Sequence, residues 1–175
     1  MYSHLQIHRR RGIFMPGKLF ICLFGTFILA VGQQAIAQDT WRALSNTGTP
    51  IGRFWNSTVW TGNEMIVWGG YNNDINSILG DGGRYNPASD TWTELPANSA
   101  PSPRQFASVV WTGTEMIVWG GYNNGATLNT GARYNPANNT WTPMSITSAP
   151  TDRVNCAAIW TGSEMIVWGG RRHSQ

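Results

Sequence analysis

Cysteine, lysine and histidine are scarce in this chain of 175 residues. Beyond residue 37 it holds one cysteine, Cys156, one histidine, His173, and no lysine. One thiol cannot form an internal disulfide, and His173 lies outside the repeating part of the chain, so neither a Ser-His-Asp triad nor a multi-histidine metal site can be assembled. Cys156 occupies a repeat position held elsewhere by Asn56 and Ala107, which favours a small packed residue over a reactive thiol. We predict no catalytic residue, no metal and no cofactor.

The basic residues that are present gather at the start of the sequence. Four of them, at positions 9–11 and 18, precede an apolar run of 14 residues at 19–32, and the small-residue pattern Ala-Ile-Ala follows at 35–37. This order is typical of a secretory signal peptide, so we predict that residues 1–37 are cleaved and that the protein is secreted, periplasmic or at the cell surface. The run is shorter than the ~20 residues that cross a bilayer, so we expect no stable membrane span after cleavage.

Removal of the predicted signal reverses the sign of the net charge. Eight arginines and nine acidic residues remain, so the formal charge falls from +3 to −1. The arginines are spread singly along the chain, whereas a nucleic-acid backbone is bound by a basic patch or stripe. We therefore predict no nucleic-acid partner.

One stretch of eleven residues occurs three times with a single position varied. WTGNEMIVWGG at 60–70 returns as WTGTEMIVWGG at 111–121 and as WTGSEMIVWGG at 160–170, which gives a period of 51 and then 49 residues. A fixed period of this size is typical of stacked or radial repeat architectures. Helical periodicity is absent after residue 37, so we predict an all-β protein.

One complete repeat contains four segments of strand-like composition. They span 106–111, 115–119, 132–135 and 140–144, with tight turns inside the first pair and the last pair. Met-Ile-Val-Trp in the second segment has no polar face, which indicates a strand covered on both sides. The Gly-Gly that follows fits a place where two backbones approach closely. A four-stranded sheet sandwiched between copies of itself is a propeller blade.

The repeat resembles the Kelch repeat. The resemblance rests on a Gly-Gly that ends an apolar strand, then a tyrosine, then a tryptophan seven residues later, as in Tyr85 with Trp92 and Tyr134 with Trp141, in a unit of ~50 residues. It implies a β-propeller with radial blades. Among exported proteins of this style, it implies a likeness to the central domain of galactose oxidase and to the sialic acid mutarotases.

The phase of the repeat predicts a partial β-propeller of four-stranded antiparallel Kelch blades at 38–170. A lone N-terminal strand near Trp41, which aligns with Trp92, comes before two full blades and a C-terminal half blade, and residues 171–175 form an aberrant tail. Propellers close with ~4 to 8 blades. We therefore expect the chain to be the N-terminal part of a longer propeller; the alternative is that several short chains assemble into a ring.

Features that recur in every repeat are expected to be architectural, because a ligand on the propeller axis needs different groups from different blades. Such features include nine of the ten tryptophans, and Trp55 is the exception. We expect ion pairing or hydrogen bonding to loop carbonyls from the repeated acidic and basic side chains, which are Glu64, Glu115, Glu164, Arg53, Arg104 and Arg153.

The two longer loops of each repeat emerge on the same side of an up-and-down blade. They join the second strand to the third and the fourth strand to the next repeat, and all variation in repeat length lies in the first of them. Because variable loops on a rigid scaffold usually carry binding, we predict that a protein or glycan ligand binds there. The candidate binding residues, all of types that also form ordinary turns, are Asn72, Asn73, Asp74, Asn76, Asp81, Asn123, Asn124 and Asn129.

The sequence is compatible with two functions. The favoured one is a secreted, non-catalytic scaffold that binds through the longer loops. The alternative is the N-terminal part of a carbohydrate-active propeller enzyme, sialic acid mutarotase-like or galactose oxidase-like, whose catalytic residues lie on blades beyond this sequence.

Overall fold

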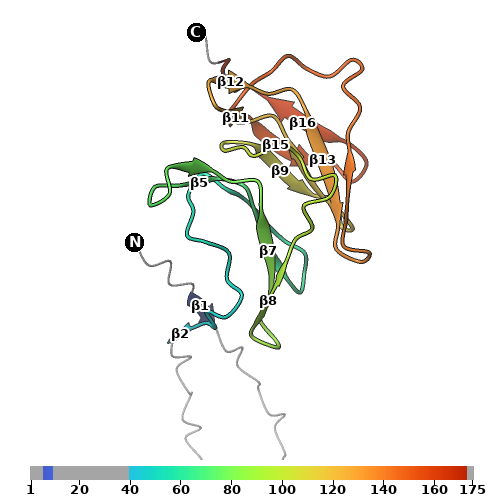
Figure 1. Cartoon of the computed structure of the whole chain (residues 1–175). Coiled ribbons are helices and arrows are strands. Elements are labelled where there is room, and N and C mark those ends of the chain that lie inside the picture. The colour runs from blue at the N-terminus through green and yellow to red at the C-terminus, as the bar shows by residue number, and fades with distance from the viewer. Residues whose placement is uncertain (1–5, 10–39, 173–175) are drawn as a thin grey trace, which may run out of the picture. The chain divides into compact units, whose positions relative to one another are not determined.

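The computed structural model describes residues 6–9 and 40–172, which form strands, bridges and turns (Figure 1). Neither range contains a helix, so none there could cross a membrane. The predicted all-β class is confirmed. The predicted signal peptide lies mostly outside the described residues, as do residues 173–175 of the predicted tail.

The chain divides into two compact units, and the smaller one contains a two-stranded antiparallel sheet. In it β1 (Gln6–Arg9) pairs with β2 (Thr40–Ala43), with Gln6 opposite Ala43. The lone strand predicted near Trp41 is therefore present. Its partner β1 comes from within the predicted signal peptide, a pairing that the repeat pattern does not indicate.

The larger unit contains two four-stranded and three two-stranded antiparallel sheets. The first blade has the strand order β3 (Ser57–Trp60), β4 (Met65–Trp68), β7 (Gly82–Asn86), β8 (Thr91–Glu94). The second blade repeats this order as β9 (Ser108–Trp111), β10 (Met116–Trp119), β13 (Gly131–Asn135), β14 (Thr140–Pro143). The half blade consists of β15 (Ala157–Trp160) and β16 (Met165–Trp168). The observed strand ends lie within two residues of the predicted ones.

The loop between the second and third strands of each full blade forms a small hairpin. These hairpins are β5 (Tyr71–Asn72) with β6 (Ser77–Ile78) and β11 (Tyr122–Asn123) with β12 (Ala126–Thr127). The sequence does not predict them, because their two-residue strands are too short to show a period. Isolated bridges from Tyr71 to Phe54 and from Tyr122 to Gln105 tie each hairpin to the chain that leads into the first strand of the same blade.

The first strands of successive blades lie beside one another. β3 contacts β9, and β9 contacts β15, which also lie together in Figure 1. Each sheet therefore places its first strand on the side where the blades meet and its fourth strand at the opposite edge. This is the arrangement of propeller blades around a hub.

The second strand of each blade is buried according to how many neighbours cover it. All four residues of β10, which has a blade on each side, are buried. In β4 only Ile66 and Trp68 are buried, whereas in β16 Ile166 is 48% and Trp168 is 79% exposed. The predicted coverage on both sides is thus confirmed for the blade that lies between two others.

The core lies between the first two blades. Ile66 and Trp68 of the first blade belong to one cluster with Met116, Val118 and Trp141 of the second. The Trp68 and Trp141 rings meet edge to face with centroids 5.5 Å apart. Burial of a side chain such as Ile66, Met116 or Val118 stabilises a protein by roughly 1.5–3 kcal/mol. The cluster between the two blades is therefore a main source of stability.

The Gly-Gly after each second strand allows the backbone of the following blade to approach. The Gly70 N–H donates to the Arg104 carbonyl at 2.8 Å, and the Gly121 N–H donates to the Arg153 carbonyl at 2.9 Å. A Cβ atom on Gly120 would lie 2.8 Å from the Arg153 carbonyl oxygen, inside the distance that real Cβ atoms keep. The predicted close approach of two backbones is confirmed.

Substitution of Gly120 tests this contact, and Gly169 is its matched control. Both have a left-handed backbone, with φ of 71° and 70°, but a Cβ atom on Gly169 would meet nothing within 4 Å. Because both variants carry the same conformational cost, we expect Gly120→Ala to lower the free energy of unfolding by about 1–3 kcal/mol more than Gly169→Ala. Urea unfolding followed by tryptophan fluorescence measures the difference, and equal losses would contradict the contact.

Candidate functional site

The predicted binding residues lie on the side of the blades that carries the longer loops, here called the long-loop rim. One of them, Asn72, is only 4% exposed. Its Nδ2 donates to the Gly52 carbonyl, and its Oδ1 accepts from the Ile75 N–H at 2.9 Å. Asn72 therefore holds two loops together from the inside and is not presented at the surface.

Three further candidates have internal partners. Asp81 lies 3.1 Å from the Nη1 atom of Arg53. The Asn76 side chain accepts a hydrogen bond from the Tyr71 hydroxyl, whereas at Asn129 the backbone carbonyl accepts one from Trp119 Nε1 at 3.1 Å. These interactions position the long loops, so ordinary turn chemistry explains much of the asparagine and aspartate content there.

The remaining candidates sit at the two hairpins of the rim. Asn73, Asp74 and Asn124 are exposed at the tips, and Asn124 adopts a left-handed turn conformation with φ of 43°. Asn123 is partly buried, and its Oδ1 has no hydrogen-bond partner among the described residues. Their role in ligand binding stays a prediction.

A group of aromatic side chains occupies the rim where the blades meet. This rim aromatic cluster consists of Phe54, Trp55 and Tyr71 from the first blade and Phe106 from the second. The Trp55 ring lies 4.4 Å from the rings of both Phe54 and Phe106, and Tyr71 lies 5.4 Å from Phe54. Trp55 remains 51% exposed despite these contacts. The cluster therefore offers an apolar surface built from two blades.

The backbone of the cluster is held in a costly conformation. Trp55 has φ of 57° and Phe106 has φ of 58°, and the Phe106 N–H donates to the Trp55 carbonyl at 3.1 Å. Asn155 occupies the same position of the third repeat with φ of 55° and donates to the Phe106 carbonyl. The same backbone conformation thus carries a different side chain in each repeat, Trp55, Phe106 and Asn155. Alignment of the repeats could have indicated the cluster, because this position varies although the arginine two residues before it is the same in all three repeats.

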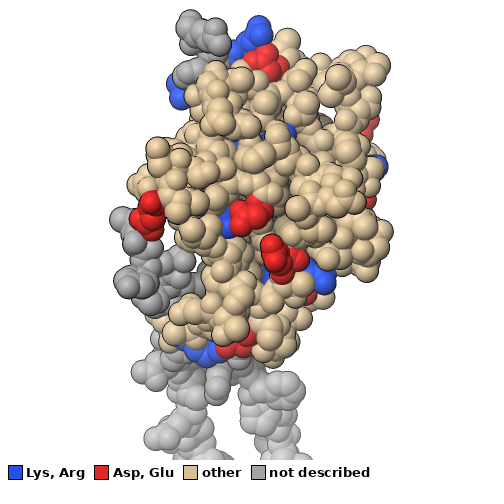
Figure 2. Space-filling view, viewed as in Figure 1, with Lys and Arg blue, Asp and Glu red and all other residues tan. Residues whose placement is uncertain are grey.

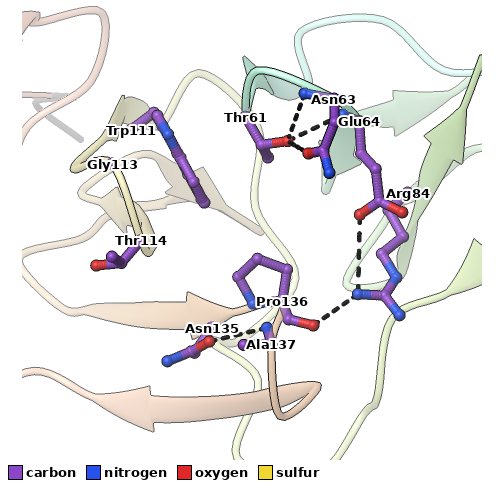
Figure 3. Close-up of a pocket in the computed structure, with 10 residues that line it drawn as sticks. All are labelled: Thr61, Asn63, Glu64, Arg84, Trp111, Gly113, Thr114, Asn135, Pro136 and Ala137. Atoms are coloured by element: carbon purple, nitrogen blue, oxygen red, sulfur yellow. Dashed lines mark hydrogen bonds and ion pairs between the residues drawn. The ribbon is translucent and has the colours of Figure 1, made fainter.

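A pocket opens at the other end of the strands, between the first and second blades (Figure 3). It measures about 470 Å³ and lies among the short turns. Glu64 and Arg84 stand on one wall, 3.8 Å apart, and the Trp111 indole stands on the other. The sequence does not indicate this pocket, because its charged and aromatic residues recur from repeat to repeat and lie far apart in the chain.

The chemistry available for catalysis or metal binding is limited. Throughout residues 6–9 and 40–172, no three His, Cys, Asp or Glu side chains gather as metal ligands would. Burial raises the pKa of the Cys156 thiol, whose Sγ lies 3.5 Å from the Gly169 carbonyl oxygen. The thiol is therefore protonated at neutral pH, which disfavours nucleophilic chemistry.

Comparison with known proteins identifies the family of these blades. The family model described as KLHDC2/KLHL20/DRC7 Kelch-repeats domain matches residues 33–175. The chain belongs to this Kelch-repeat family. Kelch domain-containing protein 3 of Homo sapiens, Mus musculus and Bos taurus is in each case 32% identical over 73 residues, which is 41% of this chain and 19% of the relative. The aligned part thus spans about a fifth of those relatives. Kelch repeats generally mediate protein binding, so the family supports a protein-binding scaffold.

The repeated charged residues of the Kelch blades act as predicted. Arg104 is 2% exposed, and its Nη1 donates to the carbonyls of Gly120 at 2.9 Å and Thr130 at 2.7 Å. Burial lowers the pKa of Arg104 to about 10, so the guanidinium is still charged at neutral pH. The architectural role expected of the arginines is confirmed. Two of the three repeated glutamates form ion pairs, Glu64 with Arg84 at 3.8 Å and Glu115 with Arg133 at 3.5 Å.

Replacement of Arg104 by lysine tests this role, with Arg153→Lys as the control. Lysine keeps the charge but loses the planar fork that serves several carbonyls at once. Arg153 makes similar bonds at a more exposed place, to Gly169 and Thr151. We expect Arg104→Lys to lower the free energy of unfolding by about 2–4 kcal/mol and Arg153→Lys by less than about 1 kcal/mol. Urea denaturation of both variants gives the comparison, and similar losses would refute a specific role for burial.

Proposed function

We propose that this Kelch-repeat chain is an exported scaffold that binds a protein partner through its long-loop rim, with the rim aromatic cluster as the anchor. The observation that carries the proposal is the half-exposed Trp55, packed by Phe54 and Phe106. Tryptophan and tyrosine are enriched among the few residues that dominate binding energy in protein interfaces.

The cluster is ordered before any partner arrives. Phe54 and Tyr71 are joined by two backbone hydrogen bonds, and Phe106 is bonded to the Trp55 carbonyl. Binding therefore loses little conformational entropy at these residues, which favours affinity. The left-handed conformation of Trp55 and Phe106 costs roughly 1–2 kcal/mol each, a cost of the kind found at functional sites.

The surroundings of the cluster suit a protein partner. The exposed hairpin candidates Asn73, Asp74 and Asn124 would supply a polar border to the apolar centre, as interfaces commonly have. On the face shown in Figure 2 the charged residues lie singly or beside residues of opposite sign, and most of the surface is uncharged. This pattern favours neither nucleic acid nor a strongly charged ligand.

Export is the second part of the proposal. It rests on the basic, apolar and small-residue order of residues 1–37. The carbohydrate-active enzyme alternative stays a prediction, because its catalytic residues would lie on blades outside this sequence.

Trp55→Ser tests the anchor, with Trp60→Ser as a matched control. Trp55 lies two residues before β3 and Trp60 is the last residue of β3, and the two are 51% and 54% exposed. Peptides selected on the full chain from a random phage library are to be titrated by biolayer interferometry. We expect Trp55→Ser to weaken their binding at least about tenfold and Trp60→Ser to change it less than about twofold. Selected peptides that bind the Trp55 variant unchanged would place the binding surface elsewhere.

Expression with the first 37 residues intact tests export separately. We expect the protein in the periplasmic or culture fraction of a bacterial host, with the intact mass of a chain whose first residue is Gln38. A variant that lacks residues 19–32 should stay in the cytoplasm. Retention of the whole sequence in the exported product would contradict cleavage and would leave the rim proposal untouched.

A further inference from the structure

The pocket between the first two blades, here called the inter-blade pocket, is separate from the long-loop rim and lies at the opposite ends of the strands (Figure 3). We propose that it binds one neutral pyranose sugar ring. The proposal rests on three groups, the Glu64 carboxylate, the Arg84 guanidinium and the Trp111 indole.

The strand register brings these groups to facing sides of two blades. Arg84 is opposite Ile66 in the β4–β7 pairing, and Ile66 packs into the core shared with the second blade. Trp111 is opposite Met116 in the β9–β10 pairing, and Met116 packs into the same core from the other side. The charged pair and the indole therefore face each other across the pocket, as Figure 3 shows.

The guanidinium is held in place by the second blade. Arg84 Nη1 donates to the Pro136 carbonyl at 2.7 Å, and Glu64 lies 3.8 Å from the same atom. Arg84 Nε is buried without a hydrogen-bond partner among the described residues. The side chains of Arg84 and Glu64 are still 22% and 19% exposed, so a ligand in the pocket can reach the pair.

The charge and shape of the pocket select the class of ligand. The opposite charges of Glu64 and Arg84 cancel, and the other lining residues are uncharged, so a neutral ligand is favoured over an ion. Neighbouring hydroxyls of a sugar both donate and accept, which matches a carboxylate acceptor beside a guanidinium donor. The Trp111 ring gives the apolar wall that the C–H face of a pyranose needs. A volume of about 470 Å³ lies within the usual range for small-molecule sites.

The next blade interface contains the same three residue types in a less complete form. Glu115 pairs with Arg133, and Trp160 takes the place of Trp111. The Arg133 side chain is 45% exposed, against 22% for Arg84, because no turn equivalent to the one at Pro136 covers it within the described residues. The charged pair between the first and second blades is therefore the better covered of the two.

The test uses the full chain and a panel of methyl pyranosides of glucose, galactose, mannose, fucose and N-acetylglucosamine. Saturation-transfer NMR detects binding, and calorimetry measures the affinity. We expect at least one glycoside to bind in the millimolar range, and Glu64→Gln and Trp111→Phe each to weaken it at least about tenfold. Glu164→Gln is the matched control, because Glu164 holds the same repeat position but is exposed and has no ion pair among the described residues. It should change the affinity less than about twofold.

Two controls distinguish loss of sugar binding from loss of the fold and a free sugar from a glycan terminus. Thermal unfolding of each variant shows whether it is folded, and the conservative Glu64→Gln change keeps the test valid should the Trp111 variant unfold. The same sugar at the end of a trisaccharide distinguishes a glycan terminus, which would bind more tightly, from a free sugar. The proposal is overturned by a panel without a binder or by binding that both variants retain.

Discussion

The backbone contact between the Gly-Gly of one blade and the repeated arginine that precedes the first strand of the next blade sets how the blades meet. Gly70 donates to the Arg104 carbonyl, and Gly121 donates to the Arg153 carbonyl in the same way. A side chain at the preceding glycine would overlap that carbonyl. The buried Arg104 then closes the second contact by binding the carbonyl of Gly120. The distance between the blades depends on these contacts. The core that contains Ile66 and Met116, the rim aromatic cluster and the inter-blade pocket all depend on that distance.

Three copies of one strand show where the stability of the blades arises. Met-Ile-Val-Trp is fully buried in β10, half-buried in β4 and largely open in β16, although the residues are identical. Trp68 is 1% exposed and Trp168 is 79% exposed. The burial therefore comes from the neighbouring blade and not from the strand itself, as in repeat proteins whose stability is a sum over adjacent units.

Much of the fold could be predicted because its signals are local and repeated. The strands, the need for glycine after β10 and the architectural role of Arg104 follow from residue type and period. The β5 and β11 hairpins could not be predicted, since two-residue strands carry no periodic signal. The pairing of β2 with β1 joins segments without any repeat relation. For the candidate site, residue type indicated the loops of the long-loop rim but could not separate the buried Asn72 from the exposed Asn73, because that difference depends on where the Gly52 carbonyl lies.

Recurrence has opposite meanings at the two ends of the blades. A ligand near the hub touches several blades at once, so its site needs different residues at equivalent positions, and the sequence of Trp55, Phe106 and Asn155 meets that need. A ligand between two blades touches only one interface, so a recurring set such as Glu64 and Arg84 can be architectural and still form a pocket. The expectation that repeated residues are only structural therefore applies to a ligand on the propeller axis and not to a ligand between two blades. For this reason the inter-blade pocket is visible in the structure but not in the sequence pattern.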